Sequence, residues 1–244
     1  MRLDKFLANL KYGSRSEIKK ILKSNLVKVN DEIVRDGSIH IDELNDIIFI
    51  NGIRVNYQKY HYLMMNKPEG YISATFDNYH KTVIDLLDEK VRLLNVYPCG
   101  RLDIDTEGLL ILSNDGNFAH KITHPKKEIY KKYYVEVDKS IYEDDIIAFQ
   151  NGLNILDGNN KPYQTKKAKL EKITNTCCYV YISEGKFHQI KRMFMKLDKK
   201  VLYLKRVQIG KLKLDDSLKL GQYKELNEND IELLFQNESK MEEF

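Results

Sequence analysis

The first 30 residues combine two short helical patterns with a strong positive charge, a combination that favours a small module separate from the rest of the chain. Apolar residues keep helical spacing at Leu3, Phe6, Leu7 and Leu10. Ser14 stands three residues before Glu17, the spacing of a capping box, and predicts the start of a second helix. The segment carries eight basic and two acidic residues. We therefore expect two helices with a positive face, which suits contacts to phosphates.

Short β-type runs follow the two helical patterns. They occupy residues 26–29, 33–34 and 47–50. The pair Asn30-Asp31 separates the first two runs, and Asn51-Gly52 follows the third; both pairs are typical of tight turns. The sequence therefore predicts a small antiparallel sheet that completes the N-terminal module.

The remainder of the chain alternates β-rich runs with helical patterns. The β-rich runs are residues 62–65, 95–97, 109–112, 132–137 and 178–182, and the helical patterns are residues 83–87, 118–122, 144–150 and 189–197. This alternation predicts an α+β domain with a mixed, mainly antiparallel sheet and flanking helices. We expect the N-terminal module over residues 1–57, a linker over 58–62, the larger domain over 63–234 and an acidic tail over 235–244.

Cysteine usage and hydropathy exclude several protein classes. The three cysteines, Cys99, Cys177 and Cys178, form no CxxC pair and leave one thiol over, so we expect neither a disulfide framework nor a zinc site. No stretch approaches the roughly 18 apolar residues that a membrane helix requires. We expect a cytoplasmic protein in a reducing compartment, with no metal and no membrane partner.

Charge is distributed unevenly along the chain. The formal net charge is +4, from 40 basic and 36 acidic residues. Residues 186–213 contain ten basic residues and one acid, whereas residues 225–244 contain seven acids and one lysine. The near-neutral total is therefore an average over opposed segments, and it does not exclude a nucleic-acid partner.

The segment from Gly100 to Gly108 places Asp103, Asp105 and Glu107 within five positions, between two β-type runs. An exposed acidic turn would explain the cluster. A paired-carboxylate metal site would also explain it, although no histidine nearby is spaced for ligation. The Asp-x-Asp spacing of aspartyl-nucleophile phosphatases is present, but Glu107 stands where their pattern needs Thr or Val. The loop residues alone leave these alternatives open.

Separated segments of the chain resemble two known families. Arg2-Leu3-Asp4-Lys5-Phe6-Leu7, Ser14-Arg15-Ser16 and Val27-Lys28-Val29-Asn30-Asp31 resemble the S4 RNA-binding domain. Five further segments occur in the order and approximate spacing of the pseudouridine synthases: Asn66-Lys67-Pro68-Glu69-Gly70-Tyr71, Gly100-Arg101-Leu102-Asp103, Lys131-Lys132-Tyr133, Glu184-Gly185-Lys186-Phe187-His188-Gln189-Ile190-Lys191-Arg192-Met193 and Arg206-Val207-Gln208-Ile209-Gly210. The resemblance is strongest to the ribosomal small-subunit branch of that family (RsuA), and it runs from Met1 to about Leu234.

The resemblance implies an isomerisation that needs no cofactor. The N1–C1′ glycosidic bond of a uridine breaks, the uracil turns over while bound, and its C5 joins C1′. Asp103 matches the family's essential aspartate, the covalent catalyst, and whether it attacks C1′ or C6 stays open. Lys191 matches the basic residue that pairs with this aspartate and keeps it ionised. Tyr133 matches the tyrosine that stacks on the target base and is a candidate for removing the C5 proton.

The resemblance and the basic segments also suggest where RNA is contacted. Arg101 matches the arginine that holds the target nucleotide out of its helix. The other expected RNA contacts are basic side chains of the two modules: Arg2, Lys5, Arg15, Lys19, Lys67, Lys186, His188, Arg192 and Arg206. For Asp105 we expect a structural role within the loop.

The function implied by the resemblance is conversion of one uridine of small-subunit (16S) rRNA to pseudouridine. The segment 188–193 is closer to the small-subunit branch than to the large-subunit one. A large-subunit uridine is one alternative, and a non-catalytic S4-domain assembly factor is another, against which the intact Asp103, Tyr133 and Lys191 argue. The expected partner is small-subunit rRNA or a partly assembled small subunit, bound by a monomer.

Overall fold

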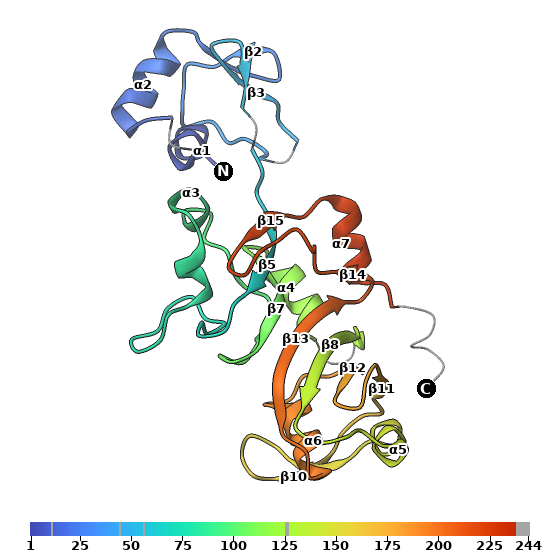
Figure 1. The fold of residues 1–244 in the computed structure, drawn as a ribbon. Coiled ribbons are helices and arrows are strands. Elements are labelled where there is room, and N and C mark those ends of the chain that lie inside the picture. The colour runs from blue at the N-terminus through green and yellow to red at the C-terminus, as the bar shows by residue number, and fades with distance from the viewer. Residues whose placement is uncertain (11, 44, 56, 125–126, 238–244) are drawn as a thin grey trace. The chain divides into compact units, whose positions relative to one another are not determined.

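The structure, a computed structural model, describes residues 1–10, 12–43, 45–55, 57–124 and 127–237. The chain divides into two compact units, Met1–Tyr60 and His61–Phe244, each with its own hydrophobic core (Figure 1). Of the acidic tail expected over 235–244, residues 238–244 lie outside the described part. No helix in the described part combines the length and apolar character of a membrane span.

The N-terminal unit packs two helices on a small antiparallel sheet. Helices α1 (Leu3–Asn9) and α2 (Arg15–Lys23) precede strands β1 (Val27–Val29), β2 (Glu32–Ile33), β3 (Ile48–Ile50) and β4 (Ile53–Arg54), which pair in the order β2-β1-β3-β4. The capping box forms as predicted, because the Glu17 N–H donates to Ser14 Oγ and the Ser14 N–H donates to the Glu17 carboxylate. The two helices and short antiparallel strands expected from the sequence are thus confirmed.

A nine-stranded mixed sheet forms the C-terminal unit. Its strands run in the order β11-β12-β8-β13-β7-β5-β15, with β14 on β13 and β6 on β7. Their bounds are β5 (Tyr62–Lys67), β6 (Tyr97–Pro98), β7 (Glu107–Ser113), β8 (Lys131–Val137), β11 (Lys169–Lys172), β12 (Cys177–Ile182), β13 (Val201–Ile209), β14 (Leu212–Lys213) and β15 (Tyr223–Glu225). The pairing of β7 with β13 is parallel, and the other recorded pairings in this sheet are antiparallel. A mixed, mainly antiparallel sheet was the expectation, and it is confirmed.

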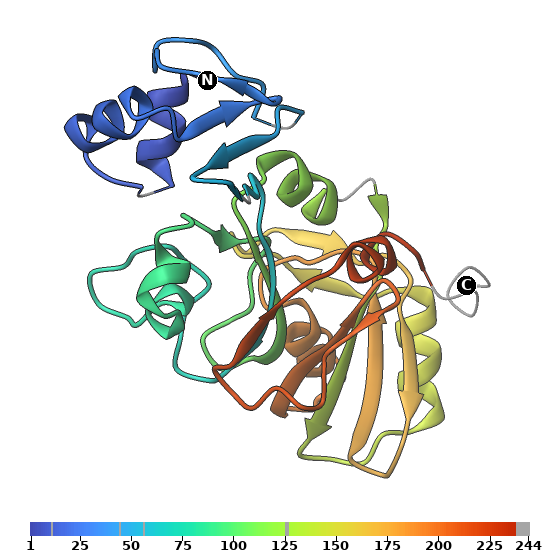
Figure 2. The ribbon, with the colours of Figure 1, turned by 90° about the horizontal axis from the view of Figure 1, so that it is seen from above.

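Helices cover both faces of this sheet. Neighbouring residues of its central strands point to opposite faces, so each of these strands contributes side chains to two cores. Leu110 and Leu112 of β7 enter one core, whereas Leu109 and Ile111 enter the other. The first core contains side chains of η1 (Val83–Leu86), α3 (Glu89–Arg92), α5 (Glu143–Asn151) and α6 (Gln189–Lys196). The second contains side chains of α4 (Gly116–Thr123) and α7 (Glu228–Leu234). Figure 2 shows the course of the strands and helices of this unit as a ribbon. Tyr133 of β8 belongs to the first core, and therefore lies on the α6 side of the sheet.

A separate two-stranded hairpin, β9 (Asn154–Leu156) and β10 (Pro162–Gln164), joins α5 to β11. Its strands did not stand out in the sequence. The Arg192 side chain on α6 donates hydrogen bonds to the carbonyls of Leu156, at 2.6 Å, and Asp157. The hairpin is therefore tied to the helix that carries Lys191.

Candidate active site

The loop that carries Asp103 connects β6 to β7, and a glycine stands at each end. Gly100 has φ +96° and Gly108 has φ +100°. A Cβ on Gly108 would lie 2.2 Å from the carbonyl oxygen of Arg206, because β7 and β13 pair at this point. Only glycine permits both the backbone conformation and this close approach. The glycine thus fixes where the loop meets β13.

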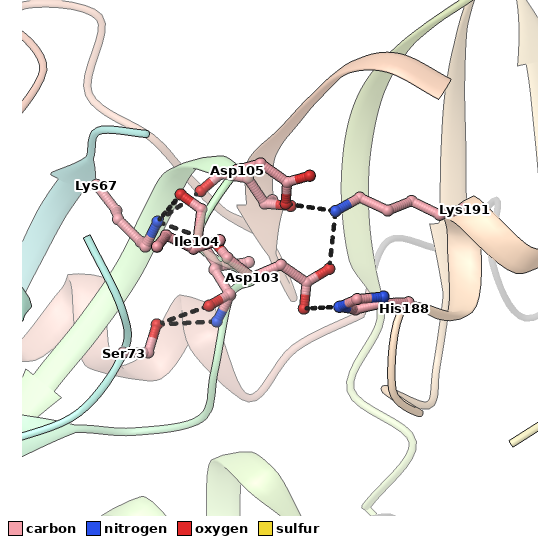
Figure 3. A network of polar contacts seen from close by, with 9 residues as sticks. Lys67, Ser73, Asp103, Ile104, Asp105, His188 and Lys191 are labelled. Carbon is pink, nitrogen blue, oxygen red and sulfur yellow. Dashed lines mark hydrogen bonds and ion pairs between the residues drawn. The ribbon is translucent and has the colours of Figure 1, made fainter. Parts of the chain in front are cut away.

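The buried side chain of Lys67 supports the loop from the end of β5. Its exposure is 0%, and its Nζ donates to the carbonyl oxygens of Thr106 (2.9 Å), Asp103 (3.0 Å), Pro68 (3.1 Å) and Ile104 (3.4 Å) (Figure 3). Burial lowers the pKa of Lys67 to about 8, while nearby carboxylates, led by Asp103, oppose this shift. The sequence suggested an RNA contact for Lys67, but its burial leaves no exposed surface for one.

Ser73 holds the same loop through the residue before Asp103. Its Oγ accepts from the Leu102 N–H at 3.0 Å and donates to the Leu102 carbonyl at 3.1 Å. The Gly70 N–H donates to the Ile104 carbonyl at 2.8 Å. The main chain on both sides of Asp103 is therefore anchored by the segment that follows β5. These contacts do not involve the Asp103 carboxylate.

Lys191 of α6 reaches two carboxylates of the loop. Its Nζ donates to Asp103 Oδ2 at 3.1 Å and to Asp105 Oδ1 at 2.5 Å (Figure 3). The side chains of Asp103 and Lys191 are only 27% and 21% exposed, whereas that of Asp105 is 55% exposed. Partial burial would raise the pKa of Asp105, but the hydrogen bond and charge of Lys191 outweigh it and lower that pKa. The cation predicted to pair with Asp103 thus lies in contact with it.

His188 lies on the other side of the Asp103 carboxylate. Its Nε2 is 3.6 Å from Asp103 Oδ1, and its ring stacks on that of Phe187 with centroids 3.7 Å apart. The backbone of His188 is left-handed, with φ +51° and ψ +31°, directly before α6 begins. This backbone turn brings His188 and Lys191 to the same carboxylate.

A pocket opens beside Asp103, and Tyr133 contributes to its wall. The lining contains Arg101, Asp103, Tyr133, Lys186 and His188, together with the apolar side chains of Leu102, Ile182, Ile190 and Leu204. Tyr133 is 8% exposed. The pocket therefore combines an aromatic and aliphatic surface, which suits a planar base, with one carboxylate that is paired with the Lys191 ammonium.

The remaining RNA-contact candidates of this unit fall into exposed and buried groups. Arg101 and Lys186 are exposed at the pocket. Arg192 is partly buried by its bonds to the β9–β10 hairpin. Arg206 is 4% exposed and donates from Nε to the Leu109 carbonyl at 2.7 Å. Arg101 and Lys186 are therefore exposed to a ligand, whereas the Arg206 side chain is buried and bonds to the main chain of β7.

The basic candidates of the N-terminal unit are exposed. Arg2, Lys5, Arg15 and Lys19 lie on α1, α2 or directly before α1. Arg2 pairs with Asp4, its Nη2 lying 2.7 Å from Oδ2. The burial of Leu3, Phe6 and Ile18 turns the opposite faces of these helices to solvent. The four basic side chains expected to contribute to a positive face are therefore all exposed.

Two features of the site were missed from the sequence. Ser73 belongs to no recognised segment, and no sequence signal pointed to its contact with Leu102. Lys67 was recognised but given an outward role. A signal for the inward role was present, because Lys67 ends an apolar run, Leu63-Met64-Met65, in a strand that is buried on both faces.

Comparisons with known proteins match both units. The family model described as RNA pseudouridylate synthase matches residues 61–196, and the S4 domain model matches residues 1–48. RNA pseudouridine synthase YtzG of Bacillus subtilis, itself uncharacterized, is 42% identical over 96% of this chain and 98% of its own length. Ribosomal small subunit pseudouridine synthase A of Escherichia coli is 37% identical over 95% and 98%. A crystal structure of a pseudouridylate synthase superposes with a TM-score of 0.67 at 37% identity, covering 96% of this chain and 99% of that one.

Proposed function

This chain belongs to the RNA pseudouridylate synthase family and is a pseudouridine synthase, and from that premise we propose that Asp103 is its covalent catalyst and that it modifies a uridine of small-subunit rRNA. The observation that carries the catalytic assignment is the position of the Asp103 carboxylate. It lies in a pocket shared with Tyr133, with one oxygen 3.1 Å from the Lys191 ammonium.

Lys191 supplies the charge that a nucleophilic carboxylate needs. Only the ionised form of Asp103 can attack carbon. A uracil bound against Asp103 displaces water from it, which would disfavour the charged form in the absence of a nearby cation. The ammonium of Lys191 compensates for that loss of solvation, and Asp105 helps to hold the ammonium in place.

The reaction is an isomerisation in which every atom is retained. Asp103 adds to C1′ or to C6, and the N1–C1′ bond breaks. The uracil turns over in the pocket, C5 bonds to C1′, and the carboxylate is released. C5 loses its proton and N1 gains one. Tyr133 provides the surface on which the base stacks, and its hydroxyl is the candidate acceptor for the C5 proton.

The substrate proposal follows from the relatives. Proteins of Escherichia coli and Haemophilus influenzae that are 37% and 38% identical to this chain are named for the small ribosomal subunit. The S4 domain and the exposed basic helices supply a second RNA surface. We propose that the enzyme acts as a monomer in the cytoplasm, on small-subunit rRNA or a partly assembled subunit, with Arg101 and Lys186 at the entrance of the pocket.

Tritium release tests the function. Small-subunit rRNA labelled with tritium at uridine C5, both naked and in assembly intermediates, should release label with wild-type protein because C5 loses its hydrogen. The variant Asp103→Asn should release none while retaining RNA affinity within a few-fold. Retained turnover in Asp103→Asn would show that another acid is the catalyst.

Labelled large-subunit rRNA, assayed in the same way, separates the alternatives. Tritium release from large-subunit rRNA, with none from small-subunit rRNA, would show that the substrate is a uridine of the large subunit. No release from any rRNA or particle, with RNA binding intact, would support a non-catalytic assembly factor. Mapping pseudouridine in cellular rRNA with and without the gene would then identify the modified position.

A further inference from the structure

A second cavity adjoins the catalytic pocket, with a volume of about 480 Å³. Arg101, Tyr133, Gly185 and Lys186 line both hollows, so the two share part of their walls. The wall of the second cavity also contains Lys131, Lys166, Glu184 and Arg206. We call this cavity the anion pocket, for the reasons that follow.

Two cations lie within the wall of the anion pocket. The Arg206 side chain is buried, and its Nη2 has no hydrogen-bond partner among the described residues. Lys131 donates to the Ile129 carbonyl at 2.8 Å. Burial, followed by the positive charge of Arg206, lowers the pKa of Lys131 to about 8; Lys166 adds to this shift and Glu184 opposes it. The buried guanidinium of Arg206 and the ammonium of Lys131 repel each other, and this repulsion destabilises their charged forms in the absence of an anion.

Acidic groups in the same wall do not neutralise these cations. Glu184 is the one acid in the described lining, against five basic side chains: Arg101, Lys131, Lys166, Lys186 and Arg206. The Glu184 carboxylate already accepts from the Lys166 N–H at 2.9 Å and from Gln189 Nε2 at 2.8 Å. Outside the lining, Glu128 pairs with the Lys166 ammonium at 2.5 Å. The cavity therefore keeps an excess of positive charge that an anionic ligand would balance.

We propose that the anion pocket binds a backbone phosphate next to the target uridine, an inference that rests on the proposed function. A nucleotide in the catalytic pocket remains linked to a phosphate on each side. The shared wall of Arg101 and Lys186 is the border that such a phosphate would cross. Phosphate oxygens accept strong, charge-assisted hydrogen bonds from ammonium and guanidinium groups, and such contacts fix the register of the RNA.

The test compares charged and neutral phosphates in the RNA. Binding is measured in an Asp103→Asn background, so that turnover does not enter, with a uridine-containing rRNA fragment that carries a methylphosphonate on either side of the target. The protein with an intact pocket should bind one of these neutral-phosphate RNAs about tenfold more weakly than native RNA. Adding Lys131→Met should weaken binding of native RNA by a similar factor and abolish the discrimination between the two RNAs.

Control variants separate a phosphate contact from a folding defect. Lys166→Ala changes an exposed residue of the same pocket and should reduce the discrimination in part, whereas Lys139→Ala, which removes an exposed lysine paired with Asp198, should leave it intact. Competition by inorganic phosphate that is weakened by Lys131→Met would show that a free phosphate also uses the pocket. The proposal would be overturned if the Lys131→Met protein discriminated as well as the protein with an intact pocket, or if the protein with an intact pocket did not discriminate at all.

Tritium release by proteins that keep Asp103, assayed beside these binding measurements, keeps the proposed function separate. Loss of discrimination in the variants with tritium release present would confirm both. Tritium release without any effect of the neutral phosphate would reject the anion pocket alone. Discrimination without tritium release would retain the pocket as an RNA-backbone site and reject the proposed reaction.

Discussion

The Asp103 carboxylate and the Lys191 ammonium, 88 residues apart in the sequence, meet at 3.1 Å. One comes from a loop fixed by β7 and the buried Lys67, the other from a helix fixed by the core beneath it. Neither element alone places the two groups. The ion pair therefore depends on the packing of α6 against the sheet.

Removing the charge of Lys191 should abolish most catalysis. Lys191→Met would leave Asp103 without its nearest cation, and we expect single-turnover tritium release to slow by about 100-fold or more, in the range of lost electrostatic stabilisation at active sites. Lys191→Arg keeps the charge and should retain much more activity. Circular dichroism would confirm that both variants fold. A Lys191→Met protein as fast as wild type would remove Lys191 from the mechanism.

Lys67 should be required for the shape of the catalytic loop. Lys67→Met removes the donor shared by four carbonyls and should lower both the free energy of unfolding, by about 3 kcal/mol, and the turnover of the folded fraction. Lys199→Met is the matched control, because Lys199 is also buried and pairs instead with Asp145 at 2.8 Å. It should destabilise without a comparable loss of turnover. Equal effects of both variants on turnover would reduce Lys67 to a general stabilising residue.

The free energy of unfolding should depend on the protonation of Lys67 at alkaline pH. Its pKa is lowered from 10.5 to about 8 by burial. Between these values the unfolded chain binds one proton more at this group, so the free energy of unfolding rises with pH there and is unaffected by this group below pH 8. The difference between wild type and Lys67→Met in urea unfolding should therefore grow by on the order of 2–3 kcal/mol from pH 7.5 to pH 10. If the difference in the free energy of unfolding shrank over this interval, the lowered pKa of Lys67 would be contradicted.

Tyr133→Phe should separate stacking from proton transfer. The ring remains, so RNA affinity should stay within a few-fold, whereas loss of the hydroxyl should slow the proton-transfer step by about 10- to 100-fold. That step would then limit the rate, and deuterium at uridine C5 should slow the variant more than the wild type. Wild-type turnover by Tyr133→Phe, with no added isotope effect, would leave Tyr133 with stacking alone.

The basic face of α2 should contribute to RNA affinity through counterion release. If Arg15 and Lys19 each contact a phosphate, Arg15→Ala/Lys19→Ala should reduce the slope of log affinity against log salt by about 1.4 to 1.8. Lys139→Ala offers a control on an exposed lysine of the other unit. An unchanged slope in the double variant would show that this face does not track phosphates.

Local patterns predicted many of the helices and turns, because residues close together in the sequence determine these elements. The Ser14–Glu17 capping box and the turn pairs Asn30-Asp31 and Asn51-Gly52 all form, with positive φ at the turn residues. The helical patterns at 118–122, 144–150 and 189–197 correspond to α4, α5 and α6. These features depend on short-range hydrogen bonds and periodicity, which a single sequence displays.

Features that depend on long-range pairing were not predicted. β13 spans Val201–Ile209 and lies at the centre of the sheet. Its lysine and arginine interrupt the apolar pattern that would otherwise predict a buried strand. Arg206 is buried there, and its backbone pairs with Gly108 of the parallel strand β7, a contact that no local pattern encodes. For the site, the resemblance to a family drew attention to Asp103, Tyr133 and Lys191, whereas the inward role of Lys67 and the contact of Ser73 became visible only in the folded chain.

The support of the catalytic loop by Lys67 has a consequence for how this enzyme can change. The hydrogen bonds of Lys67 to the loop all go to main-chain oxygens, and the side chain of Ile104 is exposed. Substitutions at Ile104 can therefore alter what the loop presents to RNA without altering the backbone that aims Asp103. A position that tolerates substitution, Ile104, thus lies next to the catalytic aspartate, whereas a position that does not, Lys67, lies 36 residues upstream of that aspartate on another strand.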